Sequence, residues 1–174
     1  MARAIIPKIW VPLDKPFIYL AGPIRGAPNW QDEAIVKLVN MDPNVTIVSP
    51  RRDVRPAIEP YIAQGTEDAF PRQRAWERQY MDMAMIRNQG VIMFWLPEEK
   101  DHRCEKSYAL ITSFELGYVL ASHTYKRPIK FCVGTDGKYP EFKVIDFDLE
   151  VDAPRVPIHN TLETTCQQAL SLMK

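Results

Sequence analysis

Residues 17–23 read FIYLAGP, a run of apolar and β-prone residues that stops at a glycine and a proline. Such a run predicts a buried β-strand that ends in a tight turn. A helix is predicted over residues 30–39, because the apolar side chains there recur at the spacing of one helix face. Asn29 precedes this segment and is a suitable N-cap. A strand, a turn and a helix in this order indicate the beginning of an α/β fold.

The same alternation continues along the chain. Further strands are predicted over residues 45–48, 91–96 and 129–133, with a fifth over 143–147, and further helices over residues 72–88, 112–122 and 161–173. Because the strands are apolar on both faces, they are typical of a mostly parallel sheet, here of four or five strands, covered by helices. We expect one domain over residues 1–174, in which residues 1–16 form an irregular N-terminal arm.

Three long or unusual loops each follow a predicted strand, over residues 22–29, 49–71 and 97–111. Loops of this kind meet at the carboxyl edge of a parallel sheet, where open α/β folds bind their ligands. The second loop contains four prolines and a basic trio, Arg51, Arg52 and Arg55. Its length is typical of a lid or a binding loop.

The composition limits the classes of partner. The 174 residues include 22 Lys and Arg and 22 Asp and Glu, so the formal charge is zero. This balance argues against a general binder of nucleic acid polymers or of anionic membranes. No apolar run approaches the length of a membrane-spanning helix, and the N-terminal residues do not resemble a signal peptide. The three cysteines lie far apart without metal-ligand spacing, which favours a reduced, cytoplasmic protein and no metal site.

Two glycines in the first loop and two carboxylates farther along carry candidate chemistry. Gly22 and Gly26 would let a ligand approach the backbone closely, although an ordinary tight turn explains them as well. Asp82 lies in an apolar stretch and either faces a functional cavity or forms a surface pair with Arg78. Glu115 is either the last residue of a capping box that begins at Thr112 or a nucleophile near a helix N-terminus.

Three motifs together resemble the nucleoside 2-deoxyribosyltransferase family. They are YLAGPI at 19–24, the helix with Asp82 followed by GVIMFWLP at 90–97, and TSFELGY at 112–118, and they occur in the order of the family. The resemblance extends over about residues 17 to 133. It implies a flavodoxin-like, Rossmann-like α/β fold with helices on both faces of the sheet. It also implies an enzyme that cleaves the N-glycosidic bond of a 2′-deoxynucleoside.

The resemblance assigns roles to individual residues. It implies that Glu115 is the nucleophile, that Tyr19 holds Glu115 in place, and that Asp82 contacts the substrate and helps to protonate the leaving base. The further residues expected to bind substrate are Gly22, Pro23, Arg25, Gly26, Trp30 and Ser113. The chain departs from the family pattern at residues 109–111, where Ala-Leu-Ile replaces a region that carries a further acid.

The implied reaction forms a covalent glutamyl–deoxyribosyl intermediate and transfers the sugar to another base, without a metal or an organic cofactor. Its partners would be a small deoxynucleoside or deoxynucleotide and a free base. A related activity is hydrolysis of 2′-deoxynucleoside 5′-monophosphates, for which Arg25 would bind the phosphate. A third hypothesis is a non-catalytic nucleotide-binding or sensor module. The resemblance further implies a homo-oligomer.

Overall fold

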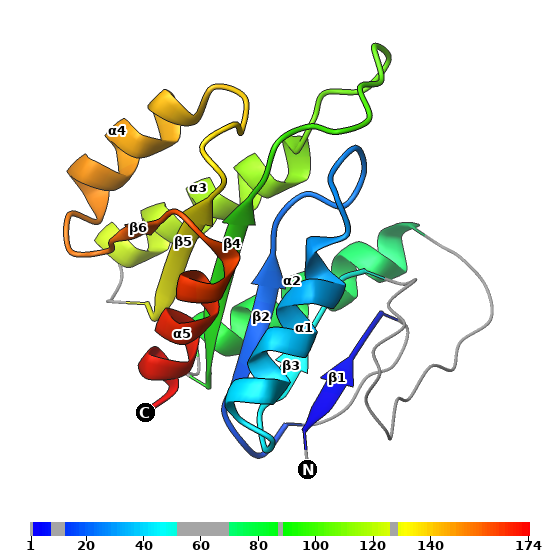
Figure 1. The fold of residues 1–174 in the computed structure, drawn as a ribbon. Helices are drawn as coiled ribbons and strands as arrows, with labels where there is room; N and C mark the ends of the chain where they lie inside the picture. The colour runs from blue at the N-terminus through cyan, green and yellow to red at the C-terminus, as the bar shows by residue number, and fades with distance from the viewer. Residues whose placement is uncertain (1, 8–12, 52–69, 87–88, 126–128) are drawn as a thin grey trace.

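The computed structural model describes residues 2–7, 13–51, 70–86, 89–125 and 129–174. These residues form six strands and five helices (Figure 1). The strands are β1 (Arg3–Ile5), β2 (Phe17–Ala21), β3 (Thr46–Val48), β4 (Gly90–Leu96), β5 (Phe131–Thr135) and β6 (Ile158–His159). The helices are α1 (Trp30–Met41), α2 (Phe70–Ile86), α3 (Leu110–Tyr125), α4 (Phe142–Asp152) and α5 (Leu162–Met173).

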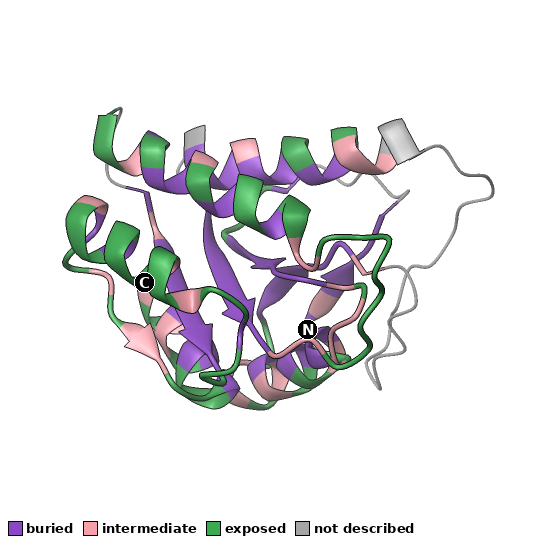
Figure 2. Cartoon of the chain, turned by 90° about the horizontal axis from the view of Figure 1, so that it is seen from above, coloured by how far each residue is buried: buried purple, intermediate pink, exposed green. Residues whose placement is uncertain are grey.

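The six strands make one sheet in the order β1-β3-β2-β4-β5-β6, and every pair of neighbours is parallel. The predicted α/β fold is therefore confirmed, and the sheet has one strand more than the upper number expected. Helices α1 and α5 cover one face of the sheet, and α2 and α3 cover the other (Figures 1 and 2). Each helix runs back along the sheet, so α2 and α3 both begin at the carboxyl edge.

The alternation of side chains along β2 decides which residues face the site. Phe17, Tyr19 and Ala21 pack into the apolar cluster beneath α2 and α3, whereas Ile18 and Leu20 pack toward α1 and α5. Every residue of β2 is buried, as Figure 2 shows for the strands at the centre of the sheet. Tyr19 is thus fixed on the same side of the sheet as helices α2 and α3.

Two predictions of local structure are wrong. Residues 143–147 belong to helix α4 instead of a fifth strand, because Phe142, Ile145 and Leu149 pack against the core at helical spacing. Residues 3–5, expected within an irregular arm, form strand β1 and pair in register with residues 46–48 of β3. Strand β6, which was not predicted, pairs with β5 at the other edge of the sheet.

The other predicted strands and helices are confirmed, with ends that shift by a few residues. Most of the predicted loop at 49–71 lies outside the described residues, and Arg52 and Arg55 lie there with it. Among the described helices, none is long and apolar enough to cross a membrane.

Candidate functional site

Glu115 lies in the second turn of α3, at the end of the helix nearest the carboxyl edge of the sheet. The helix begins at Leu110, so Thr112 is inside it and does not cap it. The capping-box alternative for Glu115 is therefore wrong. The carboxylate is instead buried, with 8 % of the residue exposed, and it bonds to another helix. Because it lies beyond the first turn, the helix dipole stabilises its charge less than the sequence suggested.

Arg74 of α2 joins Glu115 to a second carboxylate. Its Nη1 atom donates to Glu115 Oε1 at 2.7 Å and to Glu77 Oε2 at 2.5 Å. Both carboxylates are almost fully buried, and the Arg74 side chain is 28 % exposed. Buried charges of this kind require partners, and here one guanidinium serves two carboxylates. The result is a compact acid–cation–acid arrangement.

The other oxygen of Glu77 is also engaged. Gln73 Nε2 donates to Glu77 Oε1 at 2.8 Å and lies 3.3 Å from the carbonyl oxygen of Pro50, just after β3. Glu77 is therefore held from both sides. By contrast, Oε2 of Glu115 accepts no hydrogen bond from the residues that the structure describes. One oxygen of Glu115 is fixed, and the other remains available for chemistry.

Tyr19 places a buried hydroxyl near these charges. The residue is fully buried, and within the described chain its hydroxyl has no hydrogen-bond partner. Burial raises the pKa of Tyr19 well above its usual value, and the negative charges of Glu115 and Glu77 raise it further. A buried hydroxyl without a partner is uncommon, and functional sites are one place where it occurs. Tyr19 is thus a neutral donor beside two carboxylates.

The environment of Glu115 gives it an unusual charge equilibrium. Burial raises the pKa of Glu115 to about 7, and the hydrogen bond from Arg74 opposes that rise. The negative charge of Glu77 raises the pKa as well, whereas Arg74 and Arg78 lower it by their positive charge. Glu115 therefore titrates near neutral pH, which is typical of carboxylates at functional sites.

The side chain of Trp30 packs against the turn that follows β2 and is hydrogen-bonded to it. Gly22 has φ +153°, and a Cβ atom there would lie 2.4 Å from the carbonyl oxygen of Trp95 and 2.7 Å from the Trp30 ring. Trp30 Nε1 donates to the carbonyl oxygen of Pro23 at 2.8 Å. Because Trp30 is only 2 % exposed, its ring supports the turn and does not present a face on which a base could stack.

A series of hydrogen bonds that leads from Arg51 through Gln31 also ends at this turn. Gln31, which is fully buried, donates to the Pro23 carbonyl oxygen at 3.3 Å, and Arg51 Nη1 donates to Gln31 Oε1 at 3.2 Å. Arg51 comes from the segment that follows β3. Within the Gly22–Gly26 turn, Arg25 is exposed. The basic residues expected at the carboxyl edge are thus present at Arg25 and Arg51.

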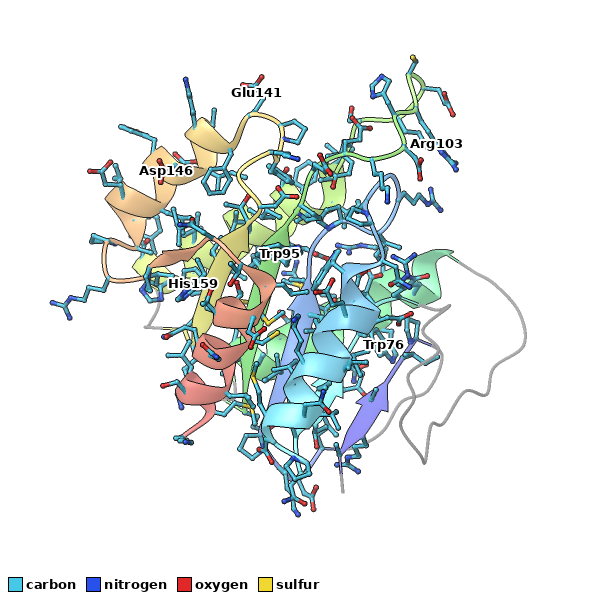
Figure 3. The ribbon with its side chains drawn as sticks, in the orientation of Figure 1. Trp76, Trp95, Arg103, Glu141, Asp146 and His159 are labelled. Atoms are coloured by element: carbon cyan, nitrogen blue, oxygen red, sulfur yellow. The ribbon has the colours of Figure 1, made fainter. Side chains whose placement is uncertain are left out.

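The turn is also tied to the loop between β4 and α3. The carbonyl oxygen of Gly26 accepts from the amides of Lys100 and Asp101, at 2.6 and 3.1 Å. The hydroxyl of Tyr108 donates to the carbonyl oxygens of Pro97 and Glu98, both at 3.0 Å. Arg103, labelled in Figure 3, lies near the far tip of this loop, away from the sheet. Two of the three predicted loops therefore meet at the carboxyl edge.

The sequence model of the nucleoside 2-deoxyribosyltransferase-like family matches residues 15–133. The chain belongs to this family. The match includes all of β2, α2 and β4, and all of α3, the helix that carries Glu115. Searches of curated proteins and of solved structures each returned no significant match.

Within this nucleoside 2-deoxyribosyltransferase-like fold, Asp82 lies apart from the pair around Arg74. Its Oδ1 atom is 3.3 Å from Arg78 Nε and accepts from the hydroxyl of Tyr118 at 3.2 Å. The guanidinium of Arg78 also lies over the Tyr118 ring, 3.8 Å from its centroid. The ion pair between Arg78 and Asp82, four residues apart on α2, is the surface pair that the sequence offered as one alternative for Asp82. Two helical turns separate Asp82 from Arg74, a rise of about 12 Å.

Ser113 is exposed on α3, and its hydroxyl donates to the carbonyl oxygen of Ala109 at 3.3 Å. Of the residues singled out from the sequence, Tyr19 and Glu115 lie together in the electrostatic site. The turn residues and Ser113 lie at the same edge of the sheet, and none of them is hydrogen-bonded to Glu115 in the part of the chain that the structure describes. Across the described ranges, no group of three or more His, Cys, Asp or Glu side chains could hold a metal ion.

Arg74 and Glu77 are the site residues that sequence reasoning missed. A weak signal exists for Glu77, because it follows the buried Trp76 and precedes the buried Tyr80 by three residues. This spacing places it at the border of the apolar face of α2. Nothing in the local pattern of Arg74 distinguishes it from a solvated arginine, because its partner Glu115 is 41 residues away.

Proposed function

We propose that the protein cleaves the N-glycosidic bond of a 2′-deoxynucleoside and transfers the sugar to another base, with Glu115 as the nucleophile. The observation that carries this proposal is the buried Glu115 carboxylate. One of its oxygens is bonded to Arg74 Nη1, and the same nitrogen is bonded to a second carboxylate, that of Glu77. Membership of the nucleoside 2-deoxyribosyltransferase-like family supports the class of bond.

The reaction would proceed in two displacements at C1′ of the sugar. In the first, the bond between C1′ and the base nitrogen breaks, and its electron pair leaves with the base, which takes up a proton. A lone pair of Glu115 Oε2 forms an ester bond to the electron-poor C1′. In the second, a nitrogen of the incoming base attacks C1′, loses its proton and releases the Glu115 carboxylate.

The two carboxylates lie closer together than the acid pair of an inverting glycosidase does. Because Glu77 Oε2 and Glu115 Oε1 both bond Arg74 Nη1, these oxygens lie no more than about 5 Å apart, twice a short hydrogen-bond length. Retaining glycosidases, which form a glycosyl–enzyme ester, hold their two carboxyl groups about 5–5.5 Å apart. Inverting enzymes need a wider gap of about 6.5–9.5 Å for a water molecule.

Tyr19 would orient the nucleophile. Its neutral hydroxyl is buried, has no hydrogen-bond partner among the described residues, and is influenced by the negative charges of Glu115 and Glu77. The family resemblance leads to the same role. A hydroxyl donor that bonds Glu115 in the ester form would also favour departure of the carboxylate in the second displacement.

Two carboxylates are candidates for the acid that protonates the leaving base. Asp82 is the residue that the family resemblance implies, but it is bonded to Arg78 and Tyr118. Glu77 shares a cation with the nucleophile and is the more deeply buried of the two. The closeness of Glu77 to the nucleophile favours it, because a general acid must lie within hydrogen-bond reach of the group that it protonates. To carry a proton, Glu77 would first have to release its bond to Arg74 or to Gln73.

The turn between β2 and α1, in which Arg25 is the exposed residue, would bind the substrate. Gly22, Pro23, Arg25 and Gly26 lie in the turn between β2 and α1, at the same sheet edge as Ser113. Trp30 would act through the turn that it supports. Hydrolysis of 2′-deoxynucleoside 5′-monophosphates is the second candidate, favoured by Arg25 on this turn and by Arg51, which reaches it through Gln31.

The proposal is tested by incubating the protein with a mixture of natural 2′-deoxynucleosides and one added free base. Chromatography should show released bases and a new deoxynucleoside of the added base. Base release from 5′-monophosphates alone, without exchange, would support the hydrolase instead. Binding without base release would support the sensor module. We also expect a homo-oligomer, which analytical ultracentrifugation would reveal.

A further inference from the structure

We propose that Arg74 is a positioning residue for the proposed transfer reaction: it holds Glu115 as an oriented, charged carboxylate and ties it to helix α2. This inference rests on the proposed function, because it assigns Arg74 a role that only a reactive Glu115 requires. Arg74 itself would not contact the reacting atoms. It would act through the carboxylate oxygen to which it is bonded.

The first support is geometric. Within the described residues, Arg74 is the one cation bonded to Glu115, at 2.7 Å from Oε1. That bond leaves Oε2 as the oxygen that can approach C1′. A guanidinium is planar and forms directed bonds, so it fixes the plane of the carboxylate as well as its charge. Removal of this bond would let the Glu115 side chain rotate about its terminal bonds.

The second support is that Arg74 is itself held in place. Glu77 binds the same Nη1 atom, and Gln73 binds the other oxygen of Glu77 and lies near the carbonyl oxygen of Pro50. A continuous series of polar contacts thus runs from the end of β3 through α2 to α3. Burial alone would lower the pKa of Arg74, but its hydrogen bonds to Glu115 and Glu77 raise it. Arg74 therefore remains charged throughout the range in which Glu115 titrates.

The third support is electrostatic. The groups that influence Glu115 are Arg74, Glu77 and Arg78 from α2 and Tyr19 from β2. Burial and Glu77 favour the neutral carboxyl, whereas the bond from Arg74 favours the carboxylate. Loss of Arg74 would therefore raise the pKa of Glu115 above about 7. A neutral carboxyl group is a poor nucleophile, so the variant would need a higher pH to react.

A merely structural role for Arg74 predicts something different. If Arg74 only joins α2 to α3, its ion pair with Glu115 would contribute to stability, and loss of the pair would lower the amount of folded protein. It would not move the pH at which the remaining folded enzyme becomes active. The position of the acid limb of the pH profile therefore separates the two roles.

The experiment measures kcat/KM for base release from a 2′-deoxynucleoside between pH 5 and pH 9. The variants are Arg74→Gln, Arg74→Lys and, as a comparison on the same helix, Arg78→Gln. We expect Arg74→Gln to move the acid limb of the pH profile upward by about one pH unit or more. At pH values below the limb, kcat/KM of this variant should then be about tenfold lower than that of the wild type. Arg74→Lys should restore the limb to near the wild-type position, and Arg78→Gln should move it less than Arg74→Gln does.

A second measurement does not depend on activity. Carbon NMR of protein labelled at glutamate carboxyl groups would follow the titration of Glu115, assigned with Glu115→Gln, in the wild type and in Arg74→Lys and Arg74→Gln. An unmoved Glu115 titration and an unmoved acid limb in folded Arg74→Gln would overturn the inference while the proposed function stands. Absence of base release by the wild-type protein would instead overturn the proposed function. If Arg74→Gln does not fold, Arg74→Lys decides. A Glu115 titration and an acid limb at the wild-type pH, together with a reduced kcat, would support the inference. A kcat of Arg74→Lys equal to that of the wild type would overturn it.

Discussion

Arg74 Nη1 and Glu115 Oε1 lie 2.7 Å apart and join helices α2 and α3 beneath the carboxyl edge of the sheet. Glu77 binds the same nitrogen, and Tyr19 approaches from β2 with a hydroxyl that has no partner among the described residues. The Arg74 cation between the two buried carboxylates orients Glu115 and favours its charged form, against the burial that raises the pKa of Glu115 to about 7. These are properties that a covalent glycosyl transfer requires of its nucleophile.

The identity of the acid can be tested by comparing Glu77→Gln with Asp82→Asn. If Glu77 protonates the leaving base, Glu77→Gln should lower the rate with natural bases by about 100-fold or more, as is typical for loss of a general acid. A 2-deoxyribosyl substrate whose leaving group departs without protonation should be affected much less. Asp82→Asn should have the smaller effect on both substrates.

Steady-state rates with the two kinds of leaving group provide the measurement, and circular dichroism confirms that each variant is folded. Equal losses for both leaving groups in Glu77→Gln would argue against an acid role. The reverse order, with the leaving-group dependence in Asp82→Asn, would restore the assignment that the family resemblance implies.

The buried Glu115 should make stability depend on pH. In the folded protein its pKa is raised from 4.5 to about 7, so the folded state binds the proton more tightly than the unfolded state does. The free energy of unfolding of the wild type should therefore fall as pH rises from about 4.5 through about 7, and Glu115→Gln should lack this contribution. Between these limits the variant should gain up to about 3 kcal/mol relative to the wild type.

Urea unfolding of both proteins at several pH values provides the measurement. Curves of unfolding free energy against pH that run parallel in the wild type and in Glu115→Gln would show that burial does not disfavour the Glu115 charge.

Gly22 should be intolerant of any side chain. A Cβ atom would lie 2.4 Å from the Trp95 carbonyl oxygen and 2.7 Å from the Trp30 ring, and φ +153° disfavours other residues. Gly22→Ala should therefore lower the free energy of unfolding by about 2 kcal/mol or more. Gly117→Ala is the matched control, because Gly117 lies in α3 with open space around its Cβ position. It should be neutral or stabilising by about 0.5–1 kcal/mol.

Thermal or urea unfolding compares the two alanine variants. Equal stability of Gly22→Ala and the wild type would show that the Gly22–Pro23 turn rearranges easily and that the contacts with Trp95 and Trp30 do not fix it.

The exposed Arg25 distinguishes the two candidate substrates. A dianionic 5′-phosphate needs a cation, whereas a neutral deoxynucleoside needs none. For a transferase we expect free deoxynucleosides to react and Arg25→Ala to change their kcat/KM by less than about threefold. If the protein is a nucleotide hydrolase, 5′-monophosphates should react far better, and Arg25→Ala should remove that preference. Paired rates with a deoxynucleoside and its monophosphate decide between the two.

Much of the fold could be predicted because its elements are long and regular. The apolar runs at β2 and β4 and the helical spacing in α1 and α5 determine buried strands and covering helices locally. Strands β1 and β6 have three and two residues and, unlike the equally short β3, they lack a run of β-branched residues. Residues 143–147 include the β-prone residues Val144, Ile145 and Phe147, and the packing of α4 on the core selects the helix.

The site was predictable only in part, for a related reason. Tyr19 and Glu115 belong to motifs that are recognisable within a few residues of sequence. Arg74 and Glu77 become site residues because α2 packs beside α3, which brings together side chains about 40 positions apart. Asp82 shows the converse, because its motif suggests a site residue while its contacts are with Arg78 and Tyr118.

The central claim is that Glu115 breaks the glycosidic bond, and base release by wild-type protein and by Glu115→Gln tests it most directly. The two proteins would be incubated with a mixture of 2′-deoxynucleosides and their 5′-monophosphates, and the free bases measured by chromatography. The account predicts base release by the wild type and a loss of about 1,000-fold or more in folded Glu115→Gln, as expected when a nucleophile is removed. Turnover by folded Glu115→Gln at a rate near that of the wild type would contradict it.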